Sequence, residues 1–257
     1  MNFRKTNRVL ILILIFPIIL FSQNKYDWNQ FGNETGEYYS APFNWDKNDI
    51  LTFGLIAIAD ISLMQFDDSI KDQFLKINSN QNNWFMEAGR YWGEPVPSIA
   101  LSGLLLIHGY TTNDETSKKI GFEIGQSFLY SVSVTSSLKI ILGRARPSTG
   151  LPSTSYSPFA FSRSNWSHPS GHTTIAFSLS TVLAANTNND ALKVLAFIPA
   201  VLTATSRMYQ NHHWASDVFL GAVIGYFTGK FVTDIHNQNE VTPYINSTPL
   251  VSLSFSF

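Results

Sequence analysis

Three short segments in the second half of the chain limit the folds that it can adopt, because together they carry cations, histidines and a carboxylate that must be brought together. They read KIILGRARP at 139–147, PSGH at 169–172 and SRMYQNHHWASD at 206–217. The residues in them that carry chemistry are Lys139, Arg146, Ser170, Gly171, His172, Arg207, His213 and Asp217. Such a set suits a tetrahedral oxyanion that one histidine attacks while another protonates a leaving group. We therefore expect a fold that gathers the three segments.

The sequence pattern predicts that these segments lie at helix ends. A long helix over 120–142 would carry Lys139 near its C-terminus, where Gly143 and Pro147 stop it. Other helices are predicted over 97–108, 171–185, 192–209 with a kink at Pro199, 213–236, and downstream of a capping Asp49. The predicted fold class is all-α, a bundle of about six helices with the site at helix ends.

Spacing within the segments supports a reaction centre. His213 and Asp217 are four residues apart at the start of a predicted helix, so they share one face. The carboxylate can accept a hydrogen bond from one ring nitrogen and leave the other free to attack. Gly171 places a backbone N–H at a helix N-terminus, where an anion is favoured, and Ser170 adds a hydroxyl.

In order and internal spacing, the segments resemble the signature of the type 2 phosphatidic acid phosphatase and vanadium haloperoxidase superfamily. The matching elements are Lys with Arg-Pro seven residues later, Pro-Ser-Gly-His, and Ser-Arg followed by His and then Asp, within residues 95–235. The resemblance implies that His213 forms a phosphohistidine, that Asp217 orients it, and that His172 is the general acid. It also implies that the phosphoryl oxygens are held by Lys139, Arg146, Ser170, Gly171 and Arg207.

Each residue also has a plainer interpretation when it is taken alone. Lys139 then reads as a solvated helix end, Arg146 or Arg207 as a surface ion pair, and His172 as a core histidine. A metal site that joins His212 with His213, Asp217 and His172 is a further alternative, but three nearby cations would repel a divalent metal. Neither His212 nor Arg144 belongs to the signature, so His212 receives no role and Arg144 is expected to be exposed.

The N-terminus resembles a secretory signal over residues 1–22. Arg4, Lys5 and Arg8 precede a thirteen-residue apolar run at 9–21 and a small Ser22. This run is shorter than the roughly twenty residues that a membrane span needs. An uncleaved anchor is the alternative. We expect export to the periplasm or cell envelope.

The remaining chain divides into three predicted parts. Residues 23–94 form a helical and irregular lead-in, irregular over 23–45, and residues 95–236 form the catalytic domain. Residues 237–257 form a tail whose alternating apolar residues read as a short strand packed on the helices. Within the catalytic domain, 111–119 reads as an exposed loop and 147–168 as a pocket wall or lid. Gly221, Gly225 and Gly229 let another helix approach the last helix closely.

Composition narrows the partners and cofactors. The 257 residues include no cysteine, which excludes disulfides and thiolate metal sites, and a net charge of −1 leaves no basic stripe for nucleic acid. Charged residues make up only 14%, which leaves a membrane location open, although Asp60 argues against a span around it. We expect a phosphatase without metal or cofactor that acts on a phosphorylated lipid, polyprenyl phosphate or diphosphate at a membrane. The alternatives are a soluble acid phosphatase, a vanadium haloperoxidase, and an inert anion-binding envelope protein; vanadate would inhibit the phosphatases.

Overall fold

The computed structural model describes residues 24–77 and 84–241, with side chains as far as residue 238. Over these residues the chain is helical and contains no strand, which confirms the all-α fold class. The helices are α1 (Trp28–Ser40), α2 (Lys47–Met64), α3 (Asp67–Ile77), α4 (Trp84–Tyr91), α5 (Pro95–Thr112), α6 (Glu115–Leu142), α7 (Gly171–Ala185), α8 (Asp190–Tyr209) and α9 (Ala215–Val241). There are more helices than the six predicted because the lead-in contributes four.

Two segments that were predicted to be irregular are helical. The prediction for residues 23–45 was wrong because Asp27 caps α1 by accepting a hydrogen bond from the backbone N–H of Gln30 at 2.9 Å. The prediction of a loop over 111–119 was also wrong. α5 continues to Thr112, and Asp114 caps α6 directly after a short turn.

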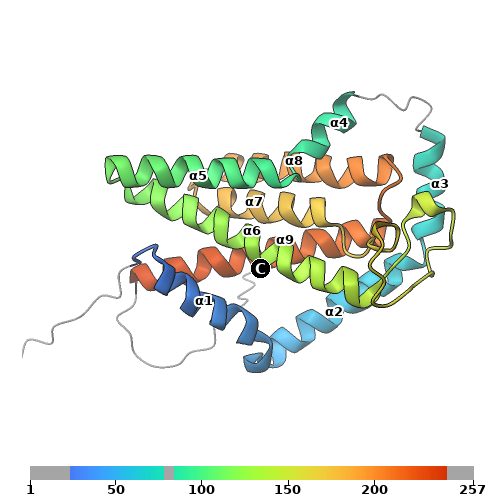
Figure 1. The fold of residues 1–257 in the computed structure, drawn as a ribbon, viewed down its shortest axis with the longest axis horizontal. Coiled ribbons are helices and arrows are strands. Elements are labelled where there is room, and N and C mark those ends of the chain that lie inside the picture. The colour runs from blue at the N-terminus through green and yellow to red at the C-terminus, as the bar shows by residue number, and fades with distance from the viewer. Residues whose placement is uncertain (1–23, 78–83, 242–257) are drawn as a thin grey trace, which may run out of the picture.

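The core of the bundle is built around α7, which packs against α6, α8 and α9 (Figure 1). The glycines of α9 permit this packing, as predicted. A Cβ at Gly221 would lie 2.6 Å from the Ser170 carbonyl oxygen, and one at Gly225 would lie 2.3 Å from that of Thr174. α5 pairs with α6, and α4 packs on α8. The C-terminal ends of α6 and α8 and the N-terminal ends of α7 and α9 lie at the same end of the bundle, so the three segments meet there (Figure 1).

The end of α6 is fixed by Gly143. Its φ of +62° is left-handed, and a Cβ there would lie 1.8 Å from the Ser157 carbonyl oxygen. Glycine is therefore required both by its backbone conformation and by this close approach. The chain then folds back over the helix ends, which brings residues 144–168 onto the same end of the bundle as Lys139.

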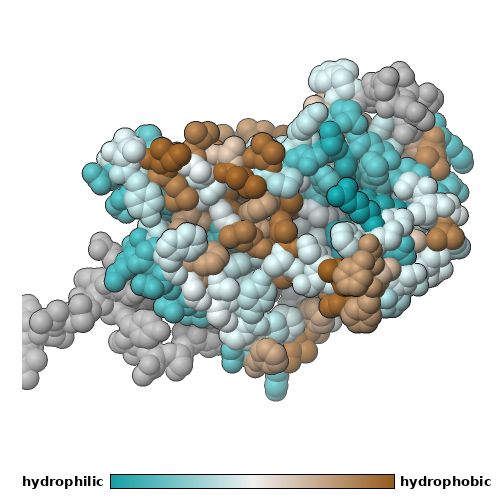
Figure 2. Space-filling model, in the orientation of Figure 1, coloured by the Kyte–Doolittle hydropathy of each residue, from teal (hydrophilic) through white to brown (hydrophobic). Residues whose placement is uncertain are grey.

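Much of the outer surface is apolar. Side chains that are more than half exposed include Ile50, Leu51, Phe53, Leu55, Ile58 and Ile61 on α2, Val96, Ile99, Leu104 and Ile107 on α5, and Leu192, Val194, Leu195 and Val201 on α8. Figure 2 shows apolar side chains gathered over α5 and a hydrophilic surface beside α4. Among the described residues, α8 and the Ala215–Gln238 part of α9 are long and apolar enough to cross a membrane. α2 and α3 pass the same test only as a pair bent by 57°.

The predicted signal at 1–22 and the strand-like tail over 242–257 lie outside the described residues. α9 continues through 237–241, where the tail was predicted to begin.

Candidate active site

The structure brings the three polar segments together at one end of the bundle. Lys139 lies in the last turn of α6, and Ser170 caps the start of α7. Arg207 lies in the last turn of α8, and Asp217 in the first turn of α9. His213 lies in the short turn between α8 and α9. Residues that are 78 positions apart in the sequence, from Lys139 to Asp217, thus belong to one cluster.

Asp217 is the centre of this cluster. It is fully buried, and its Oδ2 lies 3.3 Å from His213 Nδ1 while it accepts hydrogen bonds from the Trp214 backbone N–H at 2.9 Å and the Ser167 hydroxyl at 2.5 Å. The contact fixes the His213 ring through Nδ1. Nε2 has no hydrogen-bond partner among the described residues. Burial lowers the pKa of His213 well below its usual value, and Lys139 and Arg146 lower it further against the opposing effect of Asp217. The imidazole is therefore neutral and able to act as a nucleophile.

Arg144 is buried and donates to Asp217, so the prediction that it is exposed was wrong. Only 1% of its surface is exposed, and it donates to Asp217 Oδ1 at 2.8 Å and to Asp67 Oδ2 at 2.7 Å. Its Nε–H also donates to the Ser153 carbonyl oxygen at 2.9 Å. A buried guanidinium balances two buried carboxylates here, which would otherwise be very costly to bury.

His168 is a second residue that the sequence analysis missed. Its Nδ1 lies 3.1 Å from Asp217 Oδ1 and its Nε2 lies 3.3 Å from Asp60 Oδ2. Burial lowers the pKa of His168, but the hydrogen bonds with Asp217 and Asp60 outweigh it and raise the pKa to about 8. The available signal was the occurrence of Asp60 and Asp67 in or beside apolar helical sequence, where an isolated carboxylate needs a partner.

Lys139 and Arg146 lie near the His213 ring, and Arg207 lies near Arg146. Lys139 Nζ donates to the carbonyl oxygens of Trp166 at 2.7 Å and Ser167 at 3.2 Å, which ties the 144–168 segment to α6. Burial and Arg146 lower the pKa of Lys139 to about 7, against the effect of Asp217. Arg146 donates to backbone carbonyl oxygens, including that of His212 at 3.2 Å.

Arg207 retains donor capacity at the site. Its Nη2 donates to the side chains of Ser206 and Gln210. Its Nε is buried and has no hydrogen-bond partner among the described residues. A buried guanidinium with an unused N–H group is suited to donate a hydrogen bond to an anionic oxygen.

The start of α7 completes the set. The Ser170 side chain caps the helix by accepting from the Thr173 backbone N–H at 3.5 Å, and it also accepts from the Thr173 hydroxyl at 2.9 Å. The Ser170 backbone N–H donates to the Asp217 carbonyl oxygen at 2.8 Å. A Cβ on Gly171 would lie 3.7 Å from Lys139 Cε, so the helix N-terminus and the Lys139 side chain are neighbours. The positive end of the helix dipole and a cation thus lie side by side.

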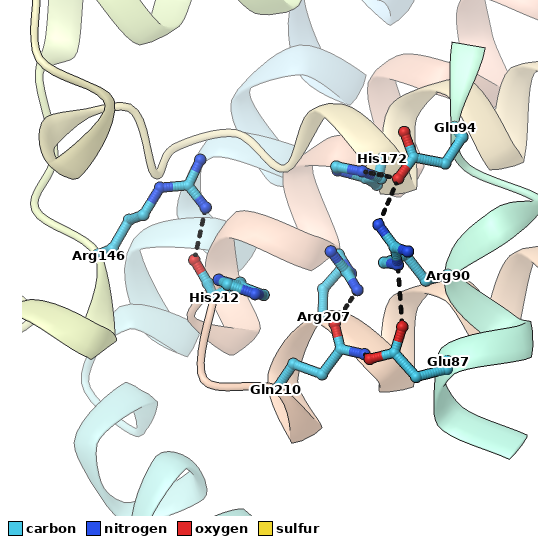
Figure 3. Close-up of a pocket in the computed structure, with 8 residues that line it drawn as sticks. All are labelled: Glu87, Arg90, Glu94, Arg146, His172, Arg207, Gln210 and His212. Atoms are coloured by element: carbon cyan, nitrogen blue, oxygen red, sulfur yellow. Dashed lines mark hydrogen bonds and ion pairs between the residues drawn. The ribbon is translucent and has the colours of Figure 1, made fainter. Parts of the chain in front are cut away.

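A cavity of about 470 Å³ opens at this end of the bundle. It is lined by Glu87, Arg90, Glu94, Arg146, His172, Arg207, Gln210 and His212 (Figure 3). Of the predicted site residues, Arg146, His172 and Arg207 line it, whereas His213, Asp217, Lys139, Ser170 and Gly171 do not. None of residues 147–168 lines it, so the structure does not support that loop as its wall; Phe161 is 80% exposed to solvent. No group of three potential metal ligands occurs among the described residues, so the alternative metal site through His212 has no support.

His172 has an acidic partner that the sequence analysis did not predict. Its Nε2 lies 3.2 Å from Glu94 Oε1, and Arg90 donates to the same oxygen at 2.8 Å. Burial and Arg207 lower the pKa of His172 to about 4, with Glu94 opposing the shift. Glu94 precedes α5 and Arg90 lies in α4, so both come from sequence outside the three segments.

Comparison with known proteins gives the same assignment as the signature. The sequence profile of the PAP2 superfamily matches residues 121–240. An undecaprenyl-diphosphatase from Sulfolobus acidocaldarius is 31% identical over 174 residues, which are 66% of this chain and 77% of that protein. The chain thus belongs to the PAP2 superfamily.

Two further matches cover different shares of the chains. A lipid A 1-phosphatase from Porphyromonas gingivalis is 39% identical over 66 residues, which are 25% of this chain and only 15% of that protein. The crystal structure of Aquifex aeolicus LpxE superimposes with a TM-score of 0.46 at 26% identity and covers 63% of this chain and 92% of that one.

Proposed function

We propose that the protein is a metal-independent phosphatase that hydrolyses a lipid or polyprenyl phosphate or diphosphate through a phosphohistidine. His213 Nε2 attacks phosphorus, and the P–O bond to the leaving group breaks as His172 donates a proton to the departing oxygen. His172 then takes a proton from water, whose oxygen attacks the phosphohistidine. Phosphate leaves as the P–N bond breaks, which regenerates both histidines.

The observation that carries the proposal is the arrangement around His213. Its neutral ring is held through Nδ1 by a buried carboxylate, has Nε2 available, and lies among fixed cations at a helix N-terminus. Preorganised positive groups are the main source of stabilisation in phosphoryl transfer. We assign phosphoryl oxygen binding to Lys139, Arg146, Arg207, Ser170 and the backbone N–H of Gly171.

An apolar groove supports a lipid substrate. It measures about 320 Å³, lies between α7, α8 and α9, and is lined by Phe177, Phe197, Phe219, Ala222, Val223, Tyr226 and Phe227. α8 and α9 are also the helices that are long and apolar enough to cross a membrane. A hydrocarbon chain in this groove would lie beside the same three helices whose ends form the reaction centre. Two relatives, a lipid A 1-phosphatase and an undecaprenyl-diphosphatase, agree with this class of substrate.

Location follows from the substrate. We propose that the protein is associated with a membrane through its apolar helices and that residues 1–22 direct its export. The catalytic end would then lie at the periplasmic or envelope surface, where it reaches the phosphorylated headgroup.

The test is phosphate release by the full-length chain in detergent, with phosphatidic acid, a polyprenyl diphosphate and p-nitrophenyl phosphate, in the presence of EDTA. We expect release that resists EDTA, is faster for a lipid substrate, and disappears in His213→Ala. Release that survives this substitution would refute the assignment of the nucleophile. Loss of release in EDTA that added metal restores would refute the metal-independent mechanism.

A further inference from the structure

A chain of charged and polar side chains joins the two sides of the cavity. Glu94 contacts His172, Arg90 donates to Glu94 at 2.8 Å and to Glu87 at 3.2 Å, and Gln210 donates to Glu87 at 2.5 Å and accepts from Arg207 (Figure 3). Three of these residues, Glu87, Arg90 and Glu94, precede residue 121, where the match to the PAP2 profile begins. They are a contribution of this chain's α4–α5 region to the site.

Glu94 is held firmly in place by the backbone around it. A Cβ at Gly93 would lie 2.4 Å from the His172 carbonyl oxygen, so the chain before Glu94 packs directly on the start of α7. α4 is fixed in turn to α8, because Thr203 donates to the Gly89 carbonyl oxygen at 2.6 Å and Ser206 donates to that of Met86 at 2.6 Å. Packing therefore fixes the backbone at Glu94, and the contacts with His172 and Arg90 orient its carboxylate.

The Glu94 side chain is not used to cap its own helix. Glu94 occupies the N-cap position of α5 with extended backbone, yet it makes no capping hydrogen bond. Its carboxylate is instead directed to His172 and Arg90.

We propose that Glu94 is a positioning residue for His172, which holds the imidazole at the cavity wall and favours its protonated form. This inference rests on the proposed function, in which His172 is the general acid. Glu94 holds one ring nitrogen and leaves the opposite one to carry the transferable proton. The arrangement parallels the Asp217–His213 pair, but with the opposite purpose: His213 must be neutral to attack, and His172 must be protonated to donate.

The charges around His172 explain why it needs a carboxylate. Burial lowers its pKa most, and Arg207 on α8 and Arg90 on α4 lower it further, while Glu94 at the start of α5 is the group that raises it. An arginine beside the general acid is unavoidable, because Arg207 is needed for the phosphoryl oxygens. A neighbouring carboxylate offsets that charge and keeps a protonated fraction available.

This role predicts an effect that depends on the leaving group. An alkoxide such as diacylglycerol needs a proton as it departs, whereas p-nitrophenolate is stable without one. Glu94→Gln keeps a side chain of the same shape and removes the charge, so it should lower kcat/KM for phosphatidic acid roughly tenfold. For p-nitrophenyl phosphate we expect no loss, because removing a negative charge beside the cavity also favours anion binding.

The experiment compares kcat/KM of wild type, Glu94→Gln, Glu94→Ala and Glu87→Gln on both substrates, with thermal unfolding of each variant in detergent. Glu87 binds the other side of Arg90 and does not contact His172, so Glu87→Gln should change both rates by the same factor. The inference is supported if the ratio of the two rates falls only in the Glu94 variants. Equal losses on both substrates, or no loss, would overturn it while wild-type activity upholds the proposed function. Absence of phosphate release by folded wild type would instead overturn the proposed function, and the inference with it.

Discussion

His213 and His236 are both buried histidines that contact carboxylates, and they lie near opposite ends of α9. His213 contacts one carboxylate through Nδ1 and has Nε2 unengaged among the described residues. His236 is engaged on both sides, with Nδ1 3.2 Å from Glu123 and Nε2 3.2 Å from Glu34. The His213 ring thus keeps one nitrogen available for a reaction, whereas both nitrogens of His236 are occupied by carboxylates.

The surroundings of the two histidines differ as well. Lys139 and Arg146 act electrostatically on His213, and Arg146 also lines the cavity together with Arg207. The His236 cluster is completed by neutral amides, since Gln126 donates to Glu34 at 2.8 Å and Asn186 donates to Glu123 at 2.5 Å. It joins α1 to α6 and α9. A buried histidine with a carboxylate therefore does not by itself indicate a reaction centre; an unengaged ring nitrogen and neighbouring cations distinguish His213 from His236.

The largest predicted difference between the His213 and His236 clusters is in catalytic activity. Asp217→Asn should lower kcat on the order of a thousandfold or more, because a neutral amide no longer fixes the tautomer of the nucleophile. Glu123→Gln at the other cluster should leave kcat unchanged. Phosphate release measured for both variants, each shown to be folded, decides the point. A similar loss from both would mean that the two clusters are not functionally distinct.

The next largest predicted difference between the two clusters is in the free energy of unfolding that a substitution costs. Arg144→Met removes the cation that balances Asp67 and Asp217, which should cost about 3–5 kcal/mol of unfolding free energy because two buried charges lose their partner. Glu34→Gln replaces a carboxylate among amides and should cost about 1–3 kcal/mol. Denaturant unfolding in detergent measures both. An equal or smaller cost for Arg144→Met would refute the account of the buried ion pairs.

The smallest predicted effect concerns pH. His168 has its pKa raised from 6.5 to about 8 in the folded state, so its ionic stabilisation is fully present below pH 6.5 and is lost as pH rises through 8. His168→Gln should therefore be about 2 kcal/mol less stable than wild type at pH 6, and the difference should narrow by pH 9. Denaturant unfolding curves of wild type and His168→Gln at pH 6 and pH 9 test this prediction. A difference that widens with pH would show that His168 is neutral in the folded protein.

Several features were predictable because they follow from local rules. Gly143 ends α6 because a left-handed φ favours glycine, and the glycines of α9 recur at helical spacing. Residues 23–45 were predicted to be irregular because Gly32 and Gly36 disfavour a helix, yet both lie within α1, where each costs only about 1 kcal/mol relative to alanine.

The sequence alone was enough to predict the residues of the proposed reaction centre and their order, because His172, His213, Asp217 and the cations occupy short segments with fixed internal spacing. It also determined the helical class, through period and caps. Only the tertiary structure decided which residues support that centre. Arg144, His168 and Glu94 acquire their roles from contacts with Asp67, Asp60 and His172. Such contacts join distant helices, and their energy comes from burial and pairing of charges that no local pattern records.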